Sequence, residues 1–254
     1  EQMEMQYFVK PSEDSLWFER WKNKRFQYYL DLGIQTENIR FNQHGPNELA
    51  HYAKDAYDIE YRFPFGWQEL EGIHNRTDYD LKRHMEFSGK DLSYLDENTR
   101  QRYVPFIIET AVGLTRSVLM LLSDAYTVDQ VSGENRILMR FHPRVAPITV
   151  GVFPLVKKDG LADHARDINI QLREGFSTFY DQSGAIGRRY RRQDEIGTPY
   201  CVTVDYDSLK DDTVTVRFRD STEQERIPRS ILVDYLNEAT ANYQRSTPTK
   251  GKKS

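Results

Sequence analysis

A carboxylate and a guanidinium lie seven residues apart in IIETAVGLTRSVLM, which spans residues 107–120. Glu109 ends an apolar run, and Arg116 follows Gly113 at the start of a Leu-rich stretch with helical spacing. An arginine in the first turn of a helix lies near the positive end of the macrodipole, so a phosphate is a sensible partner for it. A salt bridge to a nearby acid is the simpler alternative. An acid for an ammonium and an arginine for a phosphate would suit a site that joins an amino acid to ATP.

Other carboxylates lie on neighbouring segments with strand-like patterns. Glu4 is on the polar face of EQMEMQYFV, and Glu69 and Glu71 of WQELEG share a face if strand side chains alternate regularly. Like charges that converge on one sheet need cations, such as a substrate ammonium, a metal ion, Arg76 or Arg116. Any one of these acids is most simply a solvated strand end. Three such strands together favour a binding site.

The elements that would position these residues follow from periodicity. Residues 1–9 alternate as a strand, and 12–33 have the spacing of an amphipathic helix that ends at Gly33. Further along, we expect a helix passing into a strand at 47–63, a short strand at 65–72, an irregular or partly helical segment at 76–101, a strand at 103–109 and a helix from Leu114.

A second region begins near FHPRVAP, where two prolines and a change in composition predict a boundary at 142/143. Residues 143–245 alternate between strands and helices, which predicts an α/β domain with a mixed sheet. We expect QERIPRSILVDYLNEAT to form its final helix. The polar, basic residues 246–254 predict a disordered tail.

Within this second region, GRRYRRQDEIG places four arginines around Tyr190. Clustered arginine with an aromatic ring suits phosphate contacts and stacking on single-stranded RNA. A solvated face paired with Asp194 and Glu195 is an equally good explanation from composition alone. The net charge of −4 argues against a generally basic nucleic-acid-binding protein but allows a local basic patch.

Composition limits the remaining classes. The 254 residues, 38% of them hydrophobic, suffice for one large or two ordinary domains. With Cys201 as the only cysteine there is no internal disulfide, which fits a reducing, cytoplasmic location. No apolar run reaches the length of a membrane span, and no signal peptide opens the chain, so we expect no membrane association. The six histidines lack metal-ligand spacing, so we predict no zinc.

Four segments together resemble a known family. IIETAVGLTRSVLMLLSDAY resembles motif 3 of class II aminoacyl-tRNA synthetases. PFGWQELEGIHNRTDYDL and IGRRYRRQDEIGTPYCVTVD resemble homodimeric glycyl-tRNA synthetases, and EQMEMQYFV resembles the strand that closes motif 2. The resemblance covers nearly the whole chain. It implies an α+β and α/β protein: residues 1–142 would be part of an antiparallel-sheet catalytic domain, and 143–245 a mixed-sheet anticodon-binding domain.

The resemblance implies a glycine site in which Glu4 and Glu109 hold the ammonium and Arg76 lies on the substrate side. Many relatives have Glu-Pro-Ser where this chain has Glu109, Thr110 and Ala111. The missing serine contact would then fall to Thr110 or to water. The implied glycine-binding residues are Glu1, Gln2, Met3, Glu4, Arg76, Glu109, Thr110, Ala111, Val112 and Gly113.

The resemblance also implies ATP and tRNA sites. Arg116 matches the motif 3 arginine that stacks on adenine and reaches the triphosphate, and Glu69 could help hold Mg²⁺, with Glu71 the weaker candidate. The implied ATP-binding residues are Glu69, Leu70, Gly113, Leu114, Thr115 and Arg116. The expected tRNA-binding residues are Arg188, Arg189, Arg191 and Arg192.

The implied activity is ligation of glycine to tRNA(Gly) with ATP and Mg²⁺, in a homodimer. The segments that match motif 1 and the first strand of motif 2 are absent, so we expect this chain to be a fragment that is inactive alone. The alternative is a non-catalytic nucleic-acid-binding relative of the same fold, which would tend to lose the ammonium acids or the motif 3 arginine. Because Glu4, Glu109 and Arg116 are present, the enzyme is favoured. A bare RNA-binding fragment would leave the first 140 or so residues unexplained.

Overall fold

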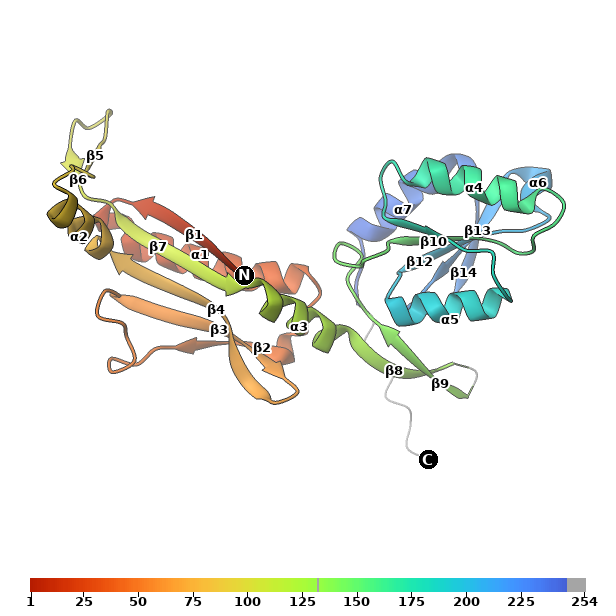
Figure 1. Cartoon of the computed structure of the whole chain (residues 1–254), viewed down its shortest axis with the longest axis horizontal. Helices are drawn as coiled ribbons and strands as arrows, with labels where there is room; N and C mark the ends of the chain where they lie inside the picture. The colour runs from red at the N-terminus through yellow and green to blue at the C-terminus, as the bar shows by residue number, and fades with distance from the viewer. Residues whose placement is uncertain (132, 246–254) are drawn as a thin grey trace. The chain divides into compact units, whose positions relative to one another are not determined.

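The computed structural model describes residues 1–131 and 133–245 and divides into two compact units, Glu1–Asp124 and Ala125–Ser254 (Figure 1). No helix in these described ranges is long and apolar enough to cross a bilayer.

The first unit is built on a five-stranded sheet in the order β1-β7-β4-β3-β2, in which every neighbouring pair is antiparallel (Figure 1). Its strands are β1 (Gln2–Val9), β2 (Ile39–Gln43), β3 (Asp55–Phe63), β4 (Gly66–Thr77) and β7 (Phe106–Gly113). The predicted strand at 1–9 is confirmed, and the one at 65–72 continues to Thr77. β7 begins at Phe106 and extends past the predicted end at Glu109.

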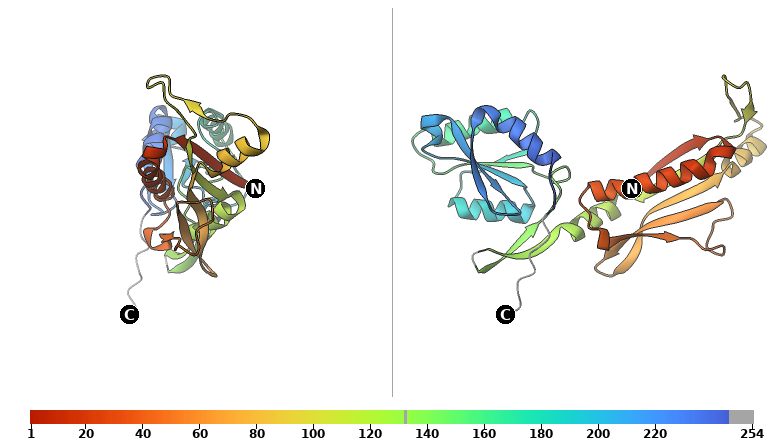
Figure 2. Two further views of the ribbon diagram at one scale, coloured as in Figure 1. Left: turned by 90° about the vertical axis from the view of Figure 1, so that its left-hand side faces the viewer. Right: turned by 180° about the vertical axis from the view of Figure 1, so that it is seen from behind.

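One face of this sheet is covered by helix α1 (Asp14–Asp31), which lies along it in Figure 2. Phe18 and Tyr29 of α1 pack with Ile59, Ile73 and Ile108 of the sheet in one buried cluster. The helix predicted at 12–33 is therefore confirmed. A 3₁₀ turn, η1 (Pro11–Glu13), precedes it, and a second, η2 (Thr36–Asn38), leads into β2. We call the sheet face that α1 does not cover the open face.

Between β4 and β7 the chain forms helix α2 (Tyr79–Ser88) and the small hairpin of β5 (Tyr94–Leu95) and β6 (Arg102–Tyr103). Helix α3 (Leu114–Ala125) follows β7 directly, as the apolar spacing predicts. The helix predicted to begin at residue 47 is wrong, because 47–54 form turns and bends before β3. The strand predicted to follow is confirmed, because β3 begins at Asp55 and pairs with both β2 and β4.

The second unit begins with a hairpin of β8 (Tyr126–Val131) and β9 (Glu134–Met139). A five-stranded sheet follows, in the order β11-β10-β12-β13-β14. Its strands are β10 (Val150–Pro154), β11 (Thr178–Tyr180), β12 (Tyr200–Val204), β13 (Thr213–Phe218) and β14 (Gln224–Pro228). β10 is parallel to β11 and β12, whereas β13 is antiparallel to its neighbours, so the predicted mixed sheet is confirmed.

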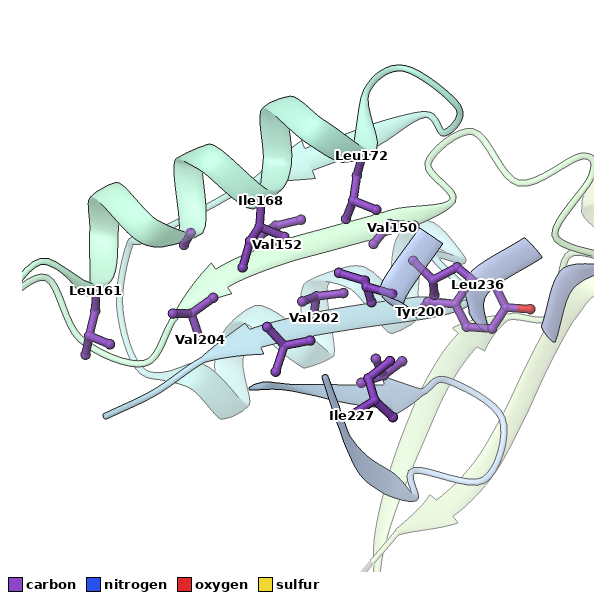
Figure 3. Close-up of a cluster of buried hydrophobic side chains, with 14 residues drawn as sticks. Val150, Val152, Leu161, Ile168, Leu172, Tyr200, Val202, Val204, Ile227 and Leu236 are labelled. Carbon is purple, nitrogen blue, oxygen red and sulfur yellow. The ribbon is translucent and has the colours of Figure 1, made fainter. Parts of the chain in front are cut away.

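Helices enclose this second sheet on both faces (Figure 1). α4 (Leu161–Leu172) and α7 (Leu232–Ala241) pack on one face, where Val152 and Val202 belong to a fully buried cluster (Figure 3). α5 (Ile186–Ile196) lies on the other face and ends at Gly197, whose φ of 95° suits only glycine well. The short elements are α6 (Ser208–Asp211) and η3 (Arg229–Ile231).

Two expectations for this region differ from the structure. Gln224–Pro228 form strand β14, and the final helix begins only at Leu232, because QERIP pairs with β13 and ends in a proline. The compact units divide at 124/125 rather than at 142/143, because Arg136 of β9 donates to Asp194 of α5 and so ties the hairpin to the second unit. The tail predicted at 246–254 lies outside the described residues.

Asp194 is the buried centre of this connection. Its carboxylate is fully buried and accepts hydrogen bonds from Arg217 at 2.8 and 3.0 Å and from Arg136 at 3.2 Å. Arg136 also donates to Asp129 of β8 at 2.6 Å. A buried carboxylate held by two guanidinium groups is costly to break, because removing it leaves buried cations uncompensated.

We therefore expect Asp194→Ala to lower the free energy of unfolding of the second unit by about 3–5 kcal/mol. Urea denaturation followed by fluorescence measures this change. Glu195→Ala is the matched control, because the neighbouring Glu195 is exposed. Equal stability of the two variants would contradict the role given to Asp194.

Candidate functional site

Strand pairing brings the predicted acids of β1 and β7 to the open face of the first sheet. Directly paired residues of antiparallel strands project to the same face. Gln6 pairs with Glu109 and Glu4 with Ala111, so these four side chains share the open face. β4 lies on the other side of β7 and pairs His74 with Glu109.

Glu109 is already paired in this site. Only 6% of the residue is exposed, and its carboxylate accepts hydrogen bonds from Arg76 Nη1 at 2.9 Å and Gln6 Nε2 at 3.1 Å. Arg76 also donates to Asp80 at 2.7 Å, and its guanidinium lies 4.2 Å from the centre of the Tyr52 ring. Hydrogen bonds to Asp80 and the nearby Glu109 charge raise the pKa of Arg76, so this cation is permanent. The structure thus joins Arg76 to Glu109, as the convergence of acids suggests.

Glu4 is exposed on the same face, and no side chain within residues 1–131 or 133–245 pairs with it. Around it the surface is made of small residues, because Ala111 is paired with Glu4 on one side and with Gly72 on the other. A Cβ on Gly72 would lie 2.8 Å from Cε1 of His74, so glycine is needed there for the imidazole to keep its place. Glu4 therefore borders a shallow floor that can accept a small cationic group.

Arg116 is also accounted for. Its Nη1 donates to the backbone carbonyl of Glu69 at 2.7 Å, while the residue remains exposed. This contact connects the first turn of α3 to β4, and it differs from the salt bridge that was the simpler alternative. The other guanidinium donors remain available to an anion. The Glu69 side chain is exposed and has no hydrogen-bonding partner within the described ranges.

The expectation that Glu69 and Glu71 share a face is wrong. The register of β3 and β4 shifts by one residue, since Ile59 pairs with Glu71 but Glu60 pairs with Glu69. Leu70 is the extra residue of this bulge, and a bulge reverses the alternation of side chains beyond it. Glu69 therefore projects to the open face, whereas Glu71 projects toward α1.

Glu71 is fully buried beneath α1. It accepts hydrogen bonds from Arg25 at 2.6 and 3.0 Å and from the Tyr29 hydroxyl. Burial, together with the Glu71 charge, raises the pKa of Tyr29 and keeps its hydroxyl a donor. Glu71 is thus engaged inside the protein and unavailable to a metal on the open face.

Several predicted ligand residues have side chains that lie away from the open face. Thr110 pairs with Met5 and Ile73 on the α1 side and is 5% exposed. It therefore cannot take the place of the serine hydroxyl expected at Ala111. Met3 and Val112 alternate in the same way, and Leu70 is 1% exposed, so only their backbone groups could reach a ligand on the open face.

The sequence analysis did not identify His74, which pairs with Glu109 across β4 and β7, or its neighbour His44. His44 Nε2 lies 2.9 Å from Asp58 Oδ2, and its ring centre is 6.1 Å from that of His74. Burial lowers the pKa of His74, although the charge of Glu109 opposes this, so the imidazole is neutral at neutral pH. The alternation of Gly72, His74 and Arg76 along β4 was the signal that could have identified it. Within the described ranges, no three histidine, cysteine or acidic side chains are grouped to hold a metal ion.

In the second unit, helical geometry separates the predicted RNA-binding arginines. Arg189 is 2% exposed and donates to the backbone carbonyls of Pro154 and Leu155, at 2.6 and 3.1 Å. It is therefore a structural residue, which corrects its assignment to tRNA. Arg192 is paired with Asp181 and Arg191 lies 3.9 Å from Glu134.

Arg188 is exposed and has no ion-pair partner within the described ranges. The Tyr190 hydroxyl is hydrogen-bonded to Thr203 at 2.6 Å, which holds this ring against the sheet. Asp194 is buried with Arg217 and so does not belong to a solvated charged face. Of the arginine cluster, Arg188 is the member most available to a phosphate.

Comparison with known proteins finds one matching domain model and several similar proteins. Residues 149–239 match the model of an anticodon binding domain. The chain is 58% identical over 252 residues to a glycine–tRNA ligase of Treponema denticola, an alignment that covers 97% of this chain and 56% of that protein.

Two further glycine–tRNA ligases show the same relation. The chain is 53% identical over 248 residues to that of Borrelia hermsii and 50% identical over 271 residues to that of Treponema pallidum. These alignments cover 96% of the chain and 56% and 59% of the relatives, respectively. The chain thus spans a little over half the length of the curated relatives it matches.

The close approach of Gly72 and His74 generates a prediction. We expect Gly72→Ala to lower the free energy of unfolding of the first unit by about 1–3 kcal/mol, because the added methyl group displaces the His74 ring. In the double variant Gly72→Ala, His74→Ala the clash is removed, so most of this loss should be absent. Thermal or urea unfolding of the single and double variants measures the coupling. Additive losses would show that the two residues do not compete for this space.

Proposed function

We propose that this chain, homologous over nearly its whole length to glycine–tRNA ligases, is a portion of such an enzyme and supplies part of its glycine, ATP and tRNA sites. The observation that carries the proposal is the open face itself, with Glu4 unpaired beside the paired Glu109 over a floor of Ala111 and Gly72.

In this proposal Glu109 and Glu4 both bind the ammonium group of the amino acid, each in a different way. Arg76 and Gln6 fix the orientation of the Glu109 carboxylate, which keeps lone pairs for an ammonium. Glu4 contributes a second, uncompensated charge. The two carboxylates and one guanidinium leave a net negative site that favours a cation.

Selection of glycine follows from the floor of the site. Ala111 and Gly72 are small, but His74 already occupies the space beside Gly72. A substrate with a side chain on its Cα would compete with these groups, and a larger substrate is easier to exclude than a smaller one. Glycine, with no side chain, avoids that competition.

ATP would bind next to the acids, at the end of β7. The planar fork of Arg116 suits phosphate oxygens or an adenine face, and its bond to the Glu69 carbonyl restricts its orientation. The exposed Glu69 carboxylate suits Mg²⁺, which commonly uses one or two carboxylates together with substrate phosphates and water. When bound, Mg²⁺ would offset phosphate charge.

The reaction requires no protein nucleophile. The glycine carboxylate attacks the α-phosphorus of ATP and pyrophosphate leaves; a ribose hydroxyl of the tRNA terminus then attacks the acyl carbon and AMP leaves. The residues of this chain contribute by holding the ammonium and the nucleotide in position and by stabilising charge. Because the relatives are longer, the activity, the homodimer and the cytoplasmic location are proposed for the whole protein.

A non-catalytic nucleic-acid-binding relative remains the second candidate. It requires only the RNA-binding unit and would not need Glu4, Glu109 and Arg116 arranged at one site. All three are present, and Glu4 has no side-chain partner in the part of the chain that the structure describes, which favours the enzyme.

Glycine-dependent exchange between ATP and pyrophosphate tests this proposal on the full-length protein that contains this chain. We expect exchange with glycine and none with alanine or serine. Glu4→Gln should reduce kcat/KM for glycine by about tenfold to a hundredfold, the cost of one charge-assisted hydrogen bond. Glu195→Gln, an exposed acid in the other unit, is the control. A folded protein that shows no exchange with any amino acid would eliminate the enzyme in favour of the non-catalytic relative.

Contact of α5 with RNA can be measured separately. We expect Arg188→Ala to weaken binding of a glycine-specific anticodon stem-loop and to reduce the slope of log affinity against log salt by about 0.7–0.9, the value for one phosphate contact. Fluorescence anisotropy over a series of salt concentrations gives both quantities. Arg166→Ala is the control, since Arg166 is a half-exposed arginine of α4 that is paired with Asp163. An unchanged salt slope for Arg188→Ala would remove α5 from the RNA interface.

A further inference from the structure

A cavity of about 350 Å³ lies in the second unit, and none of its lining residues is among those assigned to glycine, ATP or tRNA. It is bounded by the start of β12, the turn between β13 and β14 and the end of α7. Three aromatic rings line it, those of Tyr200, Phe218 and Tyr243. The Tyr200 and Phe218 rings meet edge to face with their centres 5.9 Å apart. The cavity thus has rigid aromatic walls.

The cavity also contains an unused hydrogen-bonding group. Tyr200 is 2% exposed, and its buried hydroxyl has no hydrogen-bonding partner within the described ranges. Figure 3 shows this hydroxyl directed away from the apolar cluster. The Thr240 hydroxyl is close enough to oppose the rise in the pKa of Tyr200 that burial causes, but within the described ranges neither hydroxyl makes a hydrogen bond of good geometry. Buried hydroxyls without partners are unusual in native proteins, and they indicate a missing polar group.

Carboxylates predominate among the charged groups of the cavity, where Asp220, Glu223 and Glu225 oppose the single base Arg219. Arg219 is engaged, because it donates to Asp220 and to the Gly197 carbonyl, each at 2.7 Å.

The three acids differ in whether their carboxylates already have hydrogen-bonding partners. Asp220 also accepts from Tyr243 at 2.7 Å, and Glu225 accepts from Tyr235. Glu223 has no side-chain partner within the described ranges and is exposed at the rim. The cavity is therefore net negative and has one uncompensated carboxylate.

We propose that this cavity binds an organic cation, a guanidinium or ammonium group on an apolar stem. Aromatic faces attract such cations, Glu223 supplies the counter-charge, and the Tyr200 hydroxyl oxygen can accept an N–H. The source is an arginine or lysine side chain of another protein or a free small amine, which present the same chemistry. An RNA backbone is disfavoured, because its phosphates would meet the rim carboxylates. This site is independent of the function proposed above.

Titration of the 254-residue chain with Nα-acetyl-arginine amide, followed by NMR, tests the proposal. We expect saturable shifts at residues of the cavity and none with the citrulline analogue, which has the same shape without the charge. Comparing agmatine with an arginine-containing peptide distinguishes a free amine from a protein side chain. Tighter binding of the peptide would assign the site to a protein partner, and tighter binding of agmatine to a small amine.

Two substitutions locate the contacts. Glu223→Gln should weaken binding by about twofold to fivefold, as for an exposed charge pair. Tyr200→Phe should weaken it by about fivefold through the lost hydroxyl. The variant should fold about as stably as the parent, because that hydroxyl makes no hydrogen bond of good geometry within the described ranges. Glu195→Gln, on α5, should bind like the parent.

Equal binding of the citrulline analogue, or unchanged affinity in both cavity variants, would overturn the proposal. A further outcome would also overturn it. If Tyr200→Phe weakens binding of an anticodon stem-loop while the arginine probe does not bind, the cavity holds a nucleobase rather than a cation.

Discussion

One extra residue in β4 determines both how α1 is attached to the first sheet and which acid the open face presents. The bulge at Leu70 sends Glu71 to the α1 side, where Arg25 and Tyr29 bind it and fix the helix to the sheet. The same bulge leaves Glu69 on the open face, where its carbonyl holds Arg116 at the start of α3. Without the bulge, both acids would face the same side. Either Glu71 would join Glu69 on the open face and α1 would lose its buried ion pair, or Glu69 would lie beneath α1 as a second buried carboxylate with no cation of its own.

The open face shows how a binding site can hold several acids without instability. Glu109 is buried and therefore needs Arg76, whose second partner, Asp80, holds the guanidinium in place. Glu4 is exposed, so water can solvate it when no ligand is bound. A ligand ammonium would thus meet one oriented carboxylate and one free carboxylate. The site is negative because the buried glutamate is paired with a cation, whereas the exposed glutamate on the neighbouring strand is not.

Much of this arrangement could be predicted from periodicity and resemblance, and the failures have a common physical cause. Strand alternation correctly brought Glu4 and Glu109 together, because their strands pair without a shift. It failed at Glu71, because a bulge depends on the pairing partner and leaves no mark in the local pattern. The same limit applies to QERIP, where pairing with β13 decided the local structure. The prediction that Thr110 replaces the serine contact was wrong for a related reason. Its hydroxyl could bind the ligand, but strand alternation turns the side chain toward α1.

The arginines of α5 show why residue type alone cannot assign an RNA contact. Arg188 and Arg189 are adjacent in sequence, but one helical step of about 100° separates their directions. Arg189 turns toward the sheet and satisfies carbonyls at the ends of β10 and β11, a role that requires a buried, permanent donor. Arg188 turns to solvent and has no ion-pair partner among the described residues. Helical geometry therefore places some arginines of such a cluster toward the sheet and others toward solvent. The buried ones stabilise the fold, and the exposed ones remain available to a ligand.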